Sequence, residues 1–268
     1  MPKNQVLRRP HRFKRKKPIL RNRWFLIALS FIVAAVLFIY FFSFSGLFQI
    51  KKIVVSGENN VSEEEIGFTI RESIGKRILF WETNSIFWIS PKYIERAILD
   101  KFPQIADVKI KRVFPDGLIF TIEERQALAL YSRNGNDFFL VDKTGIVYEE
   151  VFAAKNSLFV ILDKANKEAV AAGKEAMAAE LFLKIWQLKE KIENLGLLLK
   201  GVEVLSEERI AFKTSEDWEV YLDRKENLDW QIEKLKLVLE KQIPAKTLQE
   251  LEYIDLRFGD KAYYRYRD

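Results

Sequence analysis

The feature that most constrains this chain is an uncharged apolar segment near its N-terminus. From Phe25 to Phe44 the sequence is almost continuous Leu, Ile, Val, Phe and Ala, and no charged residue occurs between Trp24 and Ile50. A helix rises about 1.5 Å per residue, so a segment of this length spans roughly 30 Å, the thickness of a bilayer's hydrocarbon core. We therefore predict a transmembrane helix over residues 24–45.

The charge distribution around this segment predicts its orientation. Residues 1–23 contain ten Lys or Arg and no acidic residue, and since the whole chain carries +6, residues 24–268 carry about −4. Lys and Arg concentrate on the cytoplasmic side of membrane helices, so we expect a basic cytoplasmic tail over 1–23 and an exported remainder. In this position a basic tail indicates topology and anionic-lipid contact rather than nucleic-acid binding.

A cleaved signal peptide is the alternative interpretation of the apolar segment. Signal peptides have an apolar core of about 7–15 residues followed by a site with small residues. Here the segment is longer and ends in FIYFFSFSGLF, which is rich in bulky aromatic residues. We therefore expect the helix to be retained as an anchor.

The residue types required by several classes of enzyme are missing. The chain has no cysteine, and its single histidine, His11, lies in the basic tail. The exported part therefore offers no disulfide, thiolate zinc site, Ser-His-Asp triad or HExxH motif, and neither GxGxxG nor a P-loop occurs.

Paired carboxylates could still build a glycosidase. Adjacent acids occur at Glu123-Glu124, Glu149-Glu150 and Glu207-Glu208, but each pair lies beside a strand end or turn among alternating polar residues, which is typical of solvated charge. No group of residues in the sequence therefore requires an enzymatic explanation, and we predict no catalytic, cofactor or metal site.

The first exported residues predict a strand, a turn and a helix. Ile50, Ile53 and Val55 lie in a β-branched run, residues 57–60 have turn composition, and Ser62 to Glu65 is typical of a helix start. This helix should end near Ser73. We expect the following loop to bring four large aromatic side chains over a small core, with ligand stacking as the alternative: Phe80, Trp81, Phe87 and Trp88.

A second helix and a hairpin complete this region. Ser90-Pro91 is a helix start with proline at the first helical position, and the helix should end before Phe102-Pro103. Alternating residues over 107–114 and 118–123 flank the turn Pro115-Asp116-Gly117, which predicts two antiparallel strands. The predicted order is strand, helix, helix, strand, strand.

Two stretches of this region resemble a known family. FQIKKIVVSGENNVSEEEI at its start and FPQIADVKIKRVFPDGLIFTIEER at its end, directly after a membrane helix, resemble the POTRA domain of the bacterial FtsQ/DivIB cell-division family. We assign this domain to residues 46–124. The membrane helix and the two motifs together carry the resemblance.

The rest of the exported chain, residues 125–268, is similar to the second domain of that family. A hairpin over 138–148 has an Asp-x-x-Gly turn that places Gly145 where a left-handed backbone is needed. Strands are expected over 158–162, 202–205, 210–212, 218–222, 253–258 and 261–267, and helices over about 168–195 and 228–239. The predicted fold is α+β: a transmembrane helix, a POTRA domain, and a mixed domain with an antiparallel sheet and two long helices.

The resemblance implies a non-enzymatic scaffold of the divisome, located in the cell membrane and at the division septum. Family members bind the small single-pass coiled-coil proteins FtsB (DivIC) and FtsL and link them to septal peptidoglycan synthesis. In the family, a partner adds a strand to the last β-strand. Carried onto this chain, the binding residues are Arg257, Lys261, Ala262, Tyr263, Tyr264, Arg265 and Tyr266.

Two alternatives stay open at this stage. For any one of those side chains, the alternative is an ordinary terminal strand that pairs within its own domain. For the whole protein, the alternative is another membrane-anchored POTRA protein that acts in secretion or envelope assembly. Proteins of that kind usually carry tandem POTRA repeats or a β-barrel, and the sequence shows neither pattern.

Overall fold

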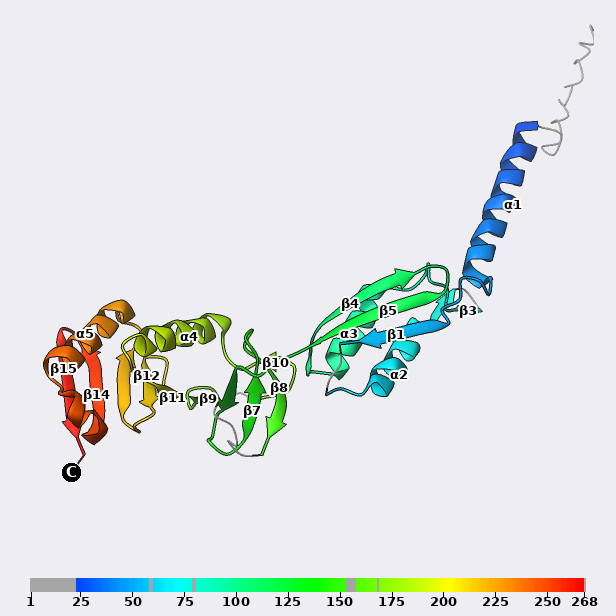
Figure 1. The fold of residues 1–268 in the computed structure, drawn as a ribbon. Coiled ribbons are helices and arrows are strands. Elements are labelled where there is room, and N and C mark those ends of the chain that lie inside the picture. Colours follow the sequence, from blue (N-terminus) through cyan, green and yellow to red (C-terminus); the bar gives the residue numbers. More distant parts are fainter. Residues whose placement is uncertain (1–22, 58–59, 79–80, 153–157, 168, 268) are drawn as a thin grey trace, which may run out of the picture. The chain divides into compact units, whose positions relative to one another are not determined.

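The computed structural model describes residues 23–57, 60–78, 81–152, 158–167 and 169–267 (Figure 1). Predictions for the basic tail up to residue 22, for Glu58 and Asn59, and for Phe80 and Glu168 lie outside these residues. The apolar segment forms helix α1, Arg23–Phe44, which is long and apolar enough to cross a membrane. By their internal contacts the residues fall into two compact units, which are described separately.

Among the described residues, the first unit holds 23–52 together with 75–78, 81–89 and 112–118. It contains α1 and a hairpin of two short strands, β2 (Lys76–Ile78) and β3 (Trp81–Thr83), where the sequence predicted a loop. Phe87 and Trp88, which were expected to cover a small core, are 40% and 39% exposed and do not pack over the sheet. They lie instead beside the C-terminal end of α1.

The predicted order of strand, helix, helix, strand, strand is confirmed. It is formed by β1 (Lys52–Ser56), α2 (Glu63–Ile74), α3 (Pro91–Lys101), β4 (Ile105–Val113) and β5 (Gly117–Glu124). The sheet order is β1-β5-β4.

The backbone at Gly57, directly after β1, requires a glycine. Its φ is +94°, a conformation that favours glycine, and a Cβ there would lie 2.3 Å from the carbonyl oxygen of Ile122 in β5. Any other residue would push these two segments apart. The left-handed backbone predicted at Gly145 is also confirmed, with φ +83°.

The second unit contains a ten-stranded sheet in the order β10-β8-β7-β6-β9-β11-β12-β13-β14-β15. The sheet is mixed rather than antiparallel, because β6–β9, β9–β11 and β13–β14 are parallel pairs. Its strands are β6 (Ala129–Ser132), β7 (Phe138–Val141), β8 (Ile146–Val151), β9 (Phe159–Asp163), β10 (Lys174–Glu175), β11 (Leu199–Val204), β12 (Arg209–Thr214), β13 (Glu219–Asp223), β14 (Leu251–Phe258) and β15 (Lys261–Tyr266).

Two helices connect parallel strands of this sheet. Helix α4 (Ala179–Glu193) lies between β9 and β11 in the chain, and α5 (Leu228–Lys241) lies between β13 and β14. Buried residues of both helices join one hydrophobic cluster with the sheet, so both cover the same face. We call the opposite face of the sheet the open face.

Helix α4 begins later than predicted. Residues 168–178 have a helix-favouring composition, but Gly173 has φ +83° and Lys174–Glu175 pairs with β8 as strand β10. The amide of Ala176 also donates to the carbonyl of Gly145, 2.8 Å away. These backbone contacts with β8 compete with helix formation in this segment.

Candidate protein-binding edge

The last strand, β15, is one edge of the ten-stranded sheet (Figure 1, red). It pairs antiparallel with β14, and among the residues that the structure describes no strand pairs with its other side. Its six residues are exposed or half-buried. An edge of this kind presents unpaired amide and carbonyl groups to any strand that approaches.

The direction of the backbone groups along β15 follows from one contact. The amide of Arg267, directly after the strand, donates to the carbonyl of Glu250, 2.7 Å away on the β14 side. Because backbone groups of an antiparallel strand alternate in direction, the amides of Tyr263 and Arg265 should also face β14. The amides of Tyr264 and Tyr266 should then face outward.

A buried lysine holds the hairpin that carries this edge. The ammonium of Lys234 in α5 donates to the carbonyl of Leu256, 2.6 Å away, and to the carbonyl of Gly259 in the turn before β15. Burial lowers the pKa of Lys234, while the nearby acids Glu226, Asp260 and Asp255 oppose this shift. The contacts tie the β14–β15 turn to the helix above it.

A groove lies between α5 and the helix-facing side of β15. Its volume is about 410 Å³, and its lining includes Trp230, Leu237 and Lys241 from the helix and Ala262 and Tyr264 from the strand. The groove is therefore lined by apolar side chains together with the charged side chains of Lys234, Lys241 and Asp260. A segment added to β15 could place side chains into this groove.

The open face beside the edge carries stacked aromatic and arginine side chains. The ring centroids of Tyr221 and Tyr253 are 5.5 Å apart, and the guanidinium of Arg209 lies 4.6 Å from the Tyr221 centroid. Arg257 lies 5.6 Å from the same ring and forms an ion pair with Asp255. Such contacts hold planar groups in fixed positions.

Six of the seven residues predicted to bind a partner lie together on β15, from Lys261 to Tyr266. The seventh, Arg257, lies one strand further in, on β14, among the open-face side chains. Sequence reasoning missed the groove residues of α5. Their signal was present, because Trp230, Lys234, Leu237 and Lys241 recur at helical spacing beside the apolar stripe.

Among the paired carboxylates, Glu124 and Glu208 have contacts of their own. Glu124 accepts hydrogen bonds from the amides of Asn60 and Val61, at 2.8 and 3.1 Å, and so holds the turn before α2. Glu208 forms an ion pair with Lys225, and Glu149 and Glu150 are exposed on β8. Glu124 is therefore not merely the solvated charge that the sequence predicted, because its carboxylate holds the turn before α2.

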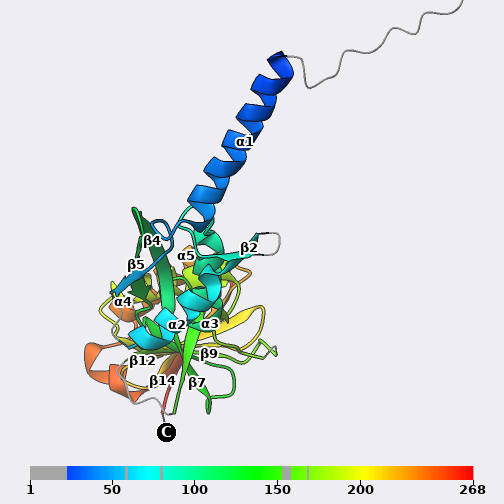
Figure 2. The ribbon, with the colours of Figure 1, turned by 90° about the vertical axis from the view of Figure 1, so that its right-hand side faces the viewer.

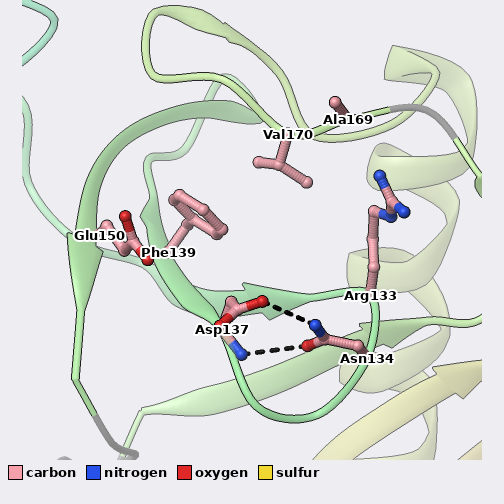
Figure 3. A pocket seen from close by; sticks show the side chains of 7 residues that line it. All are labelled: Arg133, Asn134, Asp137, Phe139, Glu150, Ala169 and Val170. Carbon is pink, nitrogen blue, oxygen red and sulfur yellow. Dashed lines mark hydrogen bonds between the residues drawn. The ribbon is translucent and has the colours of Figure 1, made fainter.

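A second hollow, of about 240 Å³, lies beside the turn between β6 and β7 (Figure 3). The Asn134 side chain donates to Asp137, 2.6 Å away, and accepts from its amide at 3.0 Å, so these groups satisfy each other. Phe139 and Val170 add apolar walls. Across the described residues no group of three potential metal ligands comes together.

Known proteins resemble this chain in both of the regions that follow α1. The family of FtsQ-type POTRA domains matches residues 48–125, and the family of C-terminal domains of cell division protein FtsQ/DivIB matches residues 129–257. The second match ends before β15.

Individual relatives agree with these matches. Cell division protein FtsQ of Neisseria meningitidis is 24% identical over 255 residues, covering 91% of this chain and 93% of the relative. Cell division protein DivIB of Clostridium botulinum is 28% identical over 155 residues, covering 58% of this chain and 54% of the relative. DivIB of Clostridium tetani is 31% identical over 103 residues, 38% of each chain.

An apolar N-terminal helix, a POTRA fold and a sheet-rich C-terminal domain define a class of POTRA-domain proteins. Within this class, the chain belongs to the FtsQ/DivIB family of bacterial cell division proteins.

Proposed function

We propose that this protein is a membrane-anchored, non-catalytic scaffold of the divisome that binds FtsB/DivIC-like and FtsL-like proteins. The partner adds a strand to the outer edge of β15, and the complex links these proteins to septal peptidoglycan synthesis. The domain division is residues 1–23 in the cytoplasm, 24–45 in the membrane, and 46–124 and 125–268 outside. Family membership supports this function over a role in secretion or envelope assembly.

The position of β15 carries the proposal. Strand addition obtains affinity from backbone hydrogen bonds and specificity from side chains that alternate between the two faces. Along β15, Tyr264 points to the groove beside α5, while Tyr263 packs against Phe258, with ring centroids 5.2 Å apart. A partner strand would therefore meet an aromatic residue on either face.

The charge of the strand favours an acidic partner segment. Lys261 and Arg265 are exposed on β15, and Arg267 follows it. Arg265 pairs with Glu252 on β14 at 3.0 Å. In the groove lining, Lys234 and Lys241 outnumber Asp260, so the cations are in excess. Opposite charges across an interface increase association rates and select against wrong partners. We expect the added strand, or the helix next to it, to carry Asp or Glu.

The proposal is tested with the full-length chain in dividing cells. A tagged chain should co-purify with short single-pass coiled-coil proteins, and a fluorescent fusion should concentrate at the septum. The variant Tyr264→Pro should lose the partner because proline removes an outward amide and blocks pairing. Tyr264→Ser keeps that amide and should weaken binding far less than the proline variant does; unchanged co-purification of the proline variant would place the contact elsewhere.

A further inference from the structure

The C-terminal end of α1 is held by side chains that follow it in the sequence. The last carbonyls of a helix lack partners within the helix. Here the hydroxyl of Ser85 donates to the carbonyl of Phe42 at 2.7 Å, and the amide side chain of Gln49 donates to the carbonyl of Ser43 at 2.9 Å. The hydroxyl of Thr83 also donates to the Ser43 carbonyl.

Two of these capping residues, Thr83 and Ser85, are buried, and Gln49 is half-buried. Ser43, Thr83 and Ser85 are among the few buried polar side chains of the first unit, and the indole of Trp88 donates to the Ser43 hydroxyl at 2.9 Å. In both ribbon views the β2–β3 hairpin lies beside this end of α1 (Figures 1 and 2). Helix α1 is thus joined to the rest of the first unit by a packed contact rather than by a free linker.

Aromatic rings extend this contact outward. Phe42 stacks on Phe48 with centroids 4.9 Å apart, and both rings lie 5.2 Å from Phe87. Phe87 in turn lies 5.6 Å from Phe114, in the hairpin tip between β4 and β5. Rings from three separate segments therefore form one continuous cluster.

This cluster continues into exposed neighbours: the ring of Phe41 lies 5.9 Å from that of Phe48, and Leu47 directly precedes Phe48 in the chain. The exposed fractions are 50% for Phe41, 54% for Leu47, 40% for Phe87 and 59% for Phe114. Contiguous exposed apolar surface of this kind marks an interaction site. We call the residues Phe41, Leu47, Phe48, Phe87, Trp88 and Phe114 the membrane-proximal patch.

Basic groups accompany the patch. Lys51, Lys52 and Arg112 are exposed in the same unit, and the acidic residues of this unit among those that the structure describes are Glu82 and Asp116. Basic residues beside a membrane helix attract anionic lipid headgroups, and aromatic side chains favour the boundary between headgroups and acyl chains.

We propose that the membrane-proximal patch docks into the outer surface of the lipid bilayer in which α1 is anchored. The proposal rests on the membrane anchoring included in the proposed function. The patch is continuous with α1, which identifies the bilayer as its binding partner. It begins on the last turn of α1, and no linker that would let it leave the membrane surface separates it from the helix. Interfacial apolar groups of this kind lie about 5–10 Å into the boundary between headgroups and acyl chains.

The absence of cysteine permits a direct test, because any introduced cysteine is the single thiol. Spin labels are attached to the full-length chain at Leu47→Cys or Phe114→Cys, and the chain is reconstituted without partners in nanodiscs containing anionic lipid. Immersion depth is measured from the relative access of oxygen and of a water-soluble nickel complex. Tyr93→Cys in α3, at an aromatic residue that is 63% exposed, serves as the matched control.

A further label at Val33→Cys, in the middle of α1, reports on anchoring separately. The proposal predicts that labels at 47 and 114 lie about 5–10 Å inside the lipid boundary while the label at 93 stays in water. Water exposure at 47 and 114 with lipid exposure at 33 would overturn the docking and leave the anchoring intact. Water exposure at 33 would contradict the anchoring itself, and exclusion of both reagents at 114 would show a protein contact instead of lipid.

Discussion

The two edges of the ten-stranded sheet are formed by strands of different length, and they differ in how readily a further strand could pair with them. At one end, β10 has two residues, Lys174 and Glu175. At the other end, β15 has six, and its outer side has no strand neighbour in the described part of the chain. Very short edge strands are one way in which proteins prevent unwanted pairing. The comparison indicates that one edge is protected and the other is available for binding.

The supports of the two edges differ as well. Near β10, the carboxylate of Asp142 accepts hydrogen bonds from the amide of Thr144 at 2.8 Å and the amide of Ile146 at 3.1 Å. It also pairs with the guanidinium of Arg125. At β15, the ammonium of Lys234 in α5 donates to two carbonyls of the β14–β15 hairpin. The protected edge is anchored by a tight turn, and the available edge by a helix.

The largest effect should come from placing proline on each edge. Tyr264→Pro removes an outward amide of β15 and should weaken partner binding at least about tenfold, since a strand hydrogen bond is lost and pairing is blocked. Lys174→Pro, on β10, should leave binding unchanged. Affinity is measured by titrating the purified partner against the full-length chain in nanodiscs; equal loss from both variants would contradict the distinction between the edges.

Removing the support of the available edge should have the next largest effect. Lys234→Met leaves the carbonyls of Leu256 and Gly259 without their donor, at a cost of about 1–3 kcal/mol. Faster hydrogen exchange of the β14 and β15 amides would report this loosening.

Lys236→Met is the control for that variant, because Lys236 is exposed and its partner Glu233 lies 3.8 Å away. It should change exchange little, since exposed ion pairs contribute about 0–1 kcal/mol. If both variants behave alike, Lys234 does not hold the hairpin.

The protected edge should respond to acid. Burial raises the pKa of Asp142, but hydrogen bonds from Thr144, Arg125 and Ile146 outweigh it and leave the pKa below its usual value. The pKa of an Asp carboxyl in the unfolded chain is about 3.9. A carboxyl whose pKa is lower in the folded protein stabilises the fold at pH values above the unfolded pKa, and this contribution is lost as the pH falls through the folded pKa.

The variant Asp142→Asn should therefore lose about 1–2 kcal/mol at neutral pH and show a shallower decline below about pH 4. Thermal unfolding of both proteins between neutral and acid pH measures this difference. Asp107→Asn, whose carboxylate lies 3.7 Å from the exposed Lys109, is the control. Parallel pH profiles for Asp142→Asn and the original chain would contradict the role of Asp142.

The smallest effect should show which face of the sheet the rest of the partner covers after its strand has paired with β15. Tyr264→Ser alters the groove beside α5, whereas Tyr263→Ser alters the contact with Phe258 on the open face. Because interface energy concentrates in aromatic residues within pockets, Tyr264→Ser should weaken binding about two- to fivefold and Tyr263→Ser less. A larger loss from Tyr263→Ser than from Tyr264→Ser would show that the rest of the partner covers the open face instead.

Periodic segments were predicted well because local sequence determines them. Helix α1, the strands β4 and β5, and the apolar stripe of α5 all follow from spacing, and the turn at Gly145 follows from its chemistry. Strand β6 was missed because its four residues are all buried, so no alternation marks it.

The parallel pairing of β13 with β14 also could not be predicted, since it depends on residues far apart in the chain. The same holds for the edge site. The exposed strand itself was predicted, but the contact of Lys234 with Leu256 joins residues 22 positions apart. Helical spacing indicates which residues share a face of α5 but does not show which strand they meet.

The most direct test of the account is residue-resolved hydrogen exchange along β15 in the full-length chain, with and without the purified FtsB/DivIC-like partner. Strand addition predicts that binding slows exchange at the outward amides of Ala262, Tyr264 and Tyr266, while the amides of Tyr263 and Arg265, already facing β14, change less. Unchanged exchange along β15 with new protection at another surface would contradict the proposed binding edge.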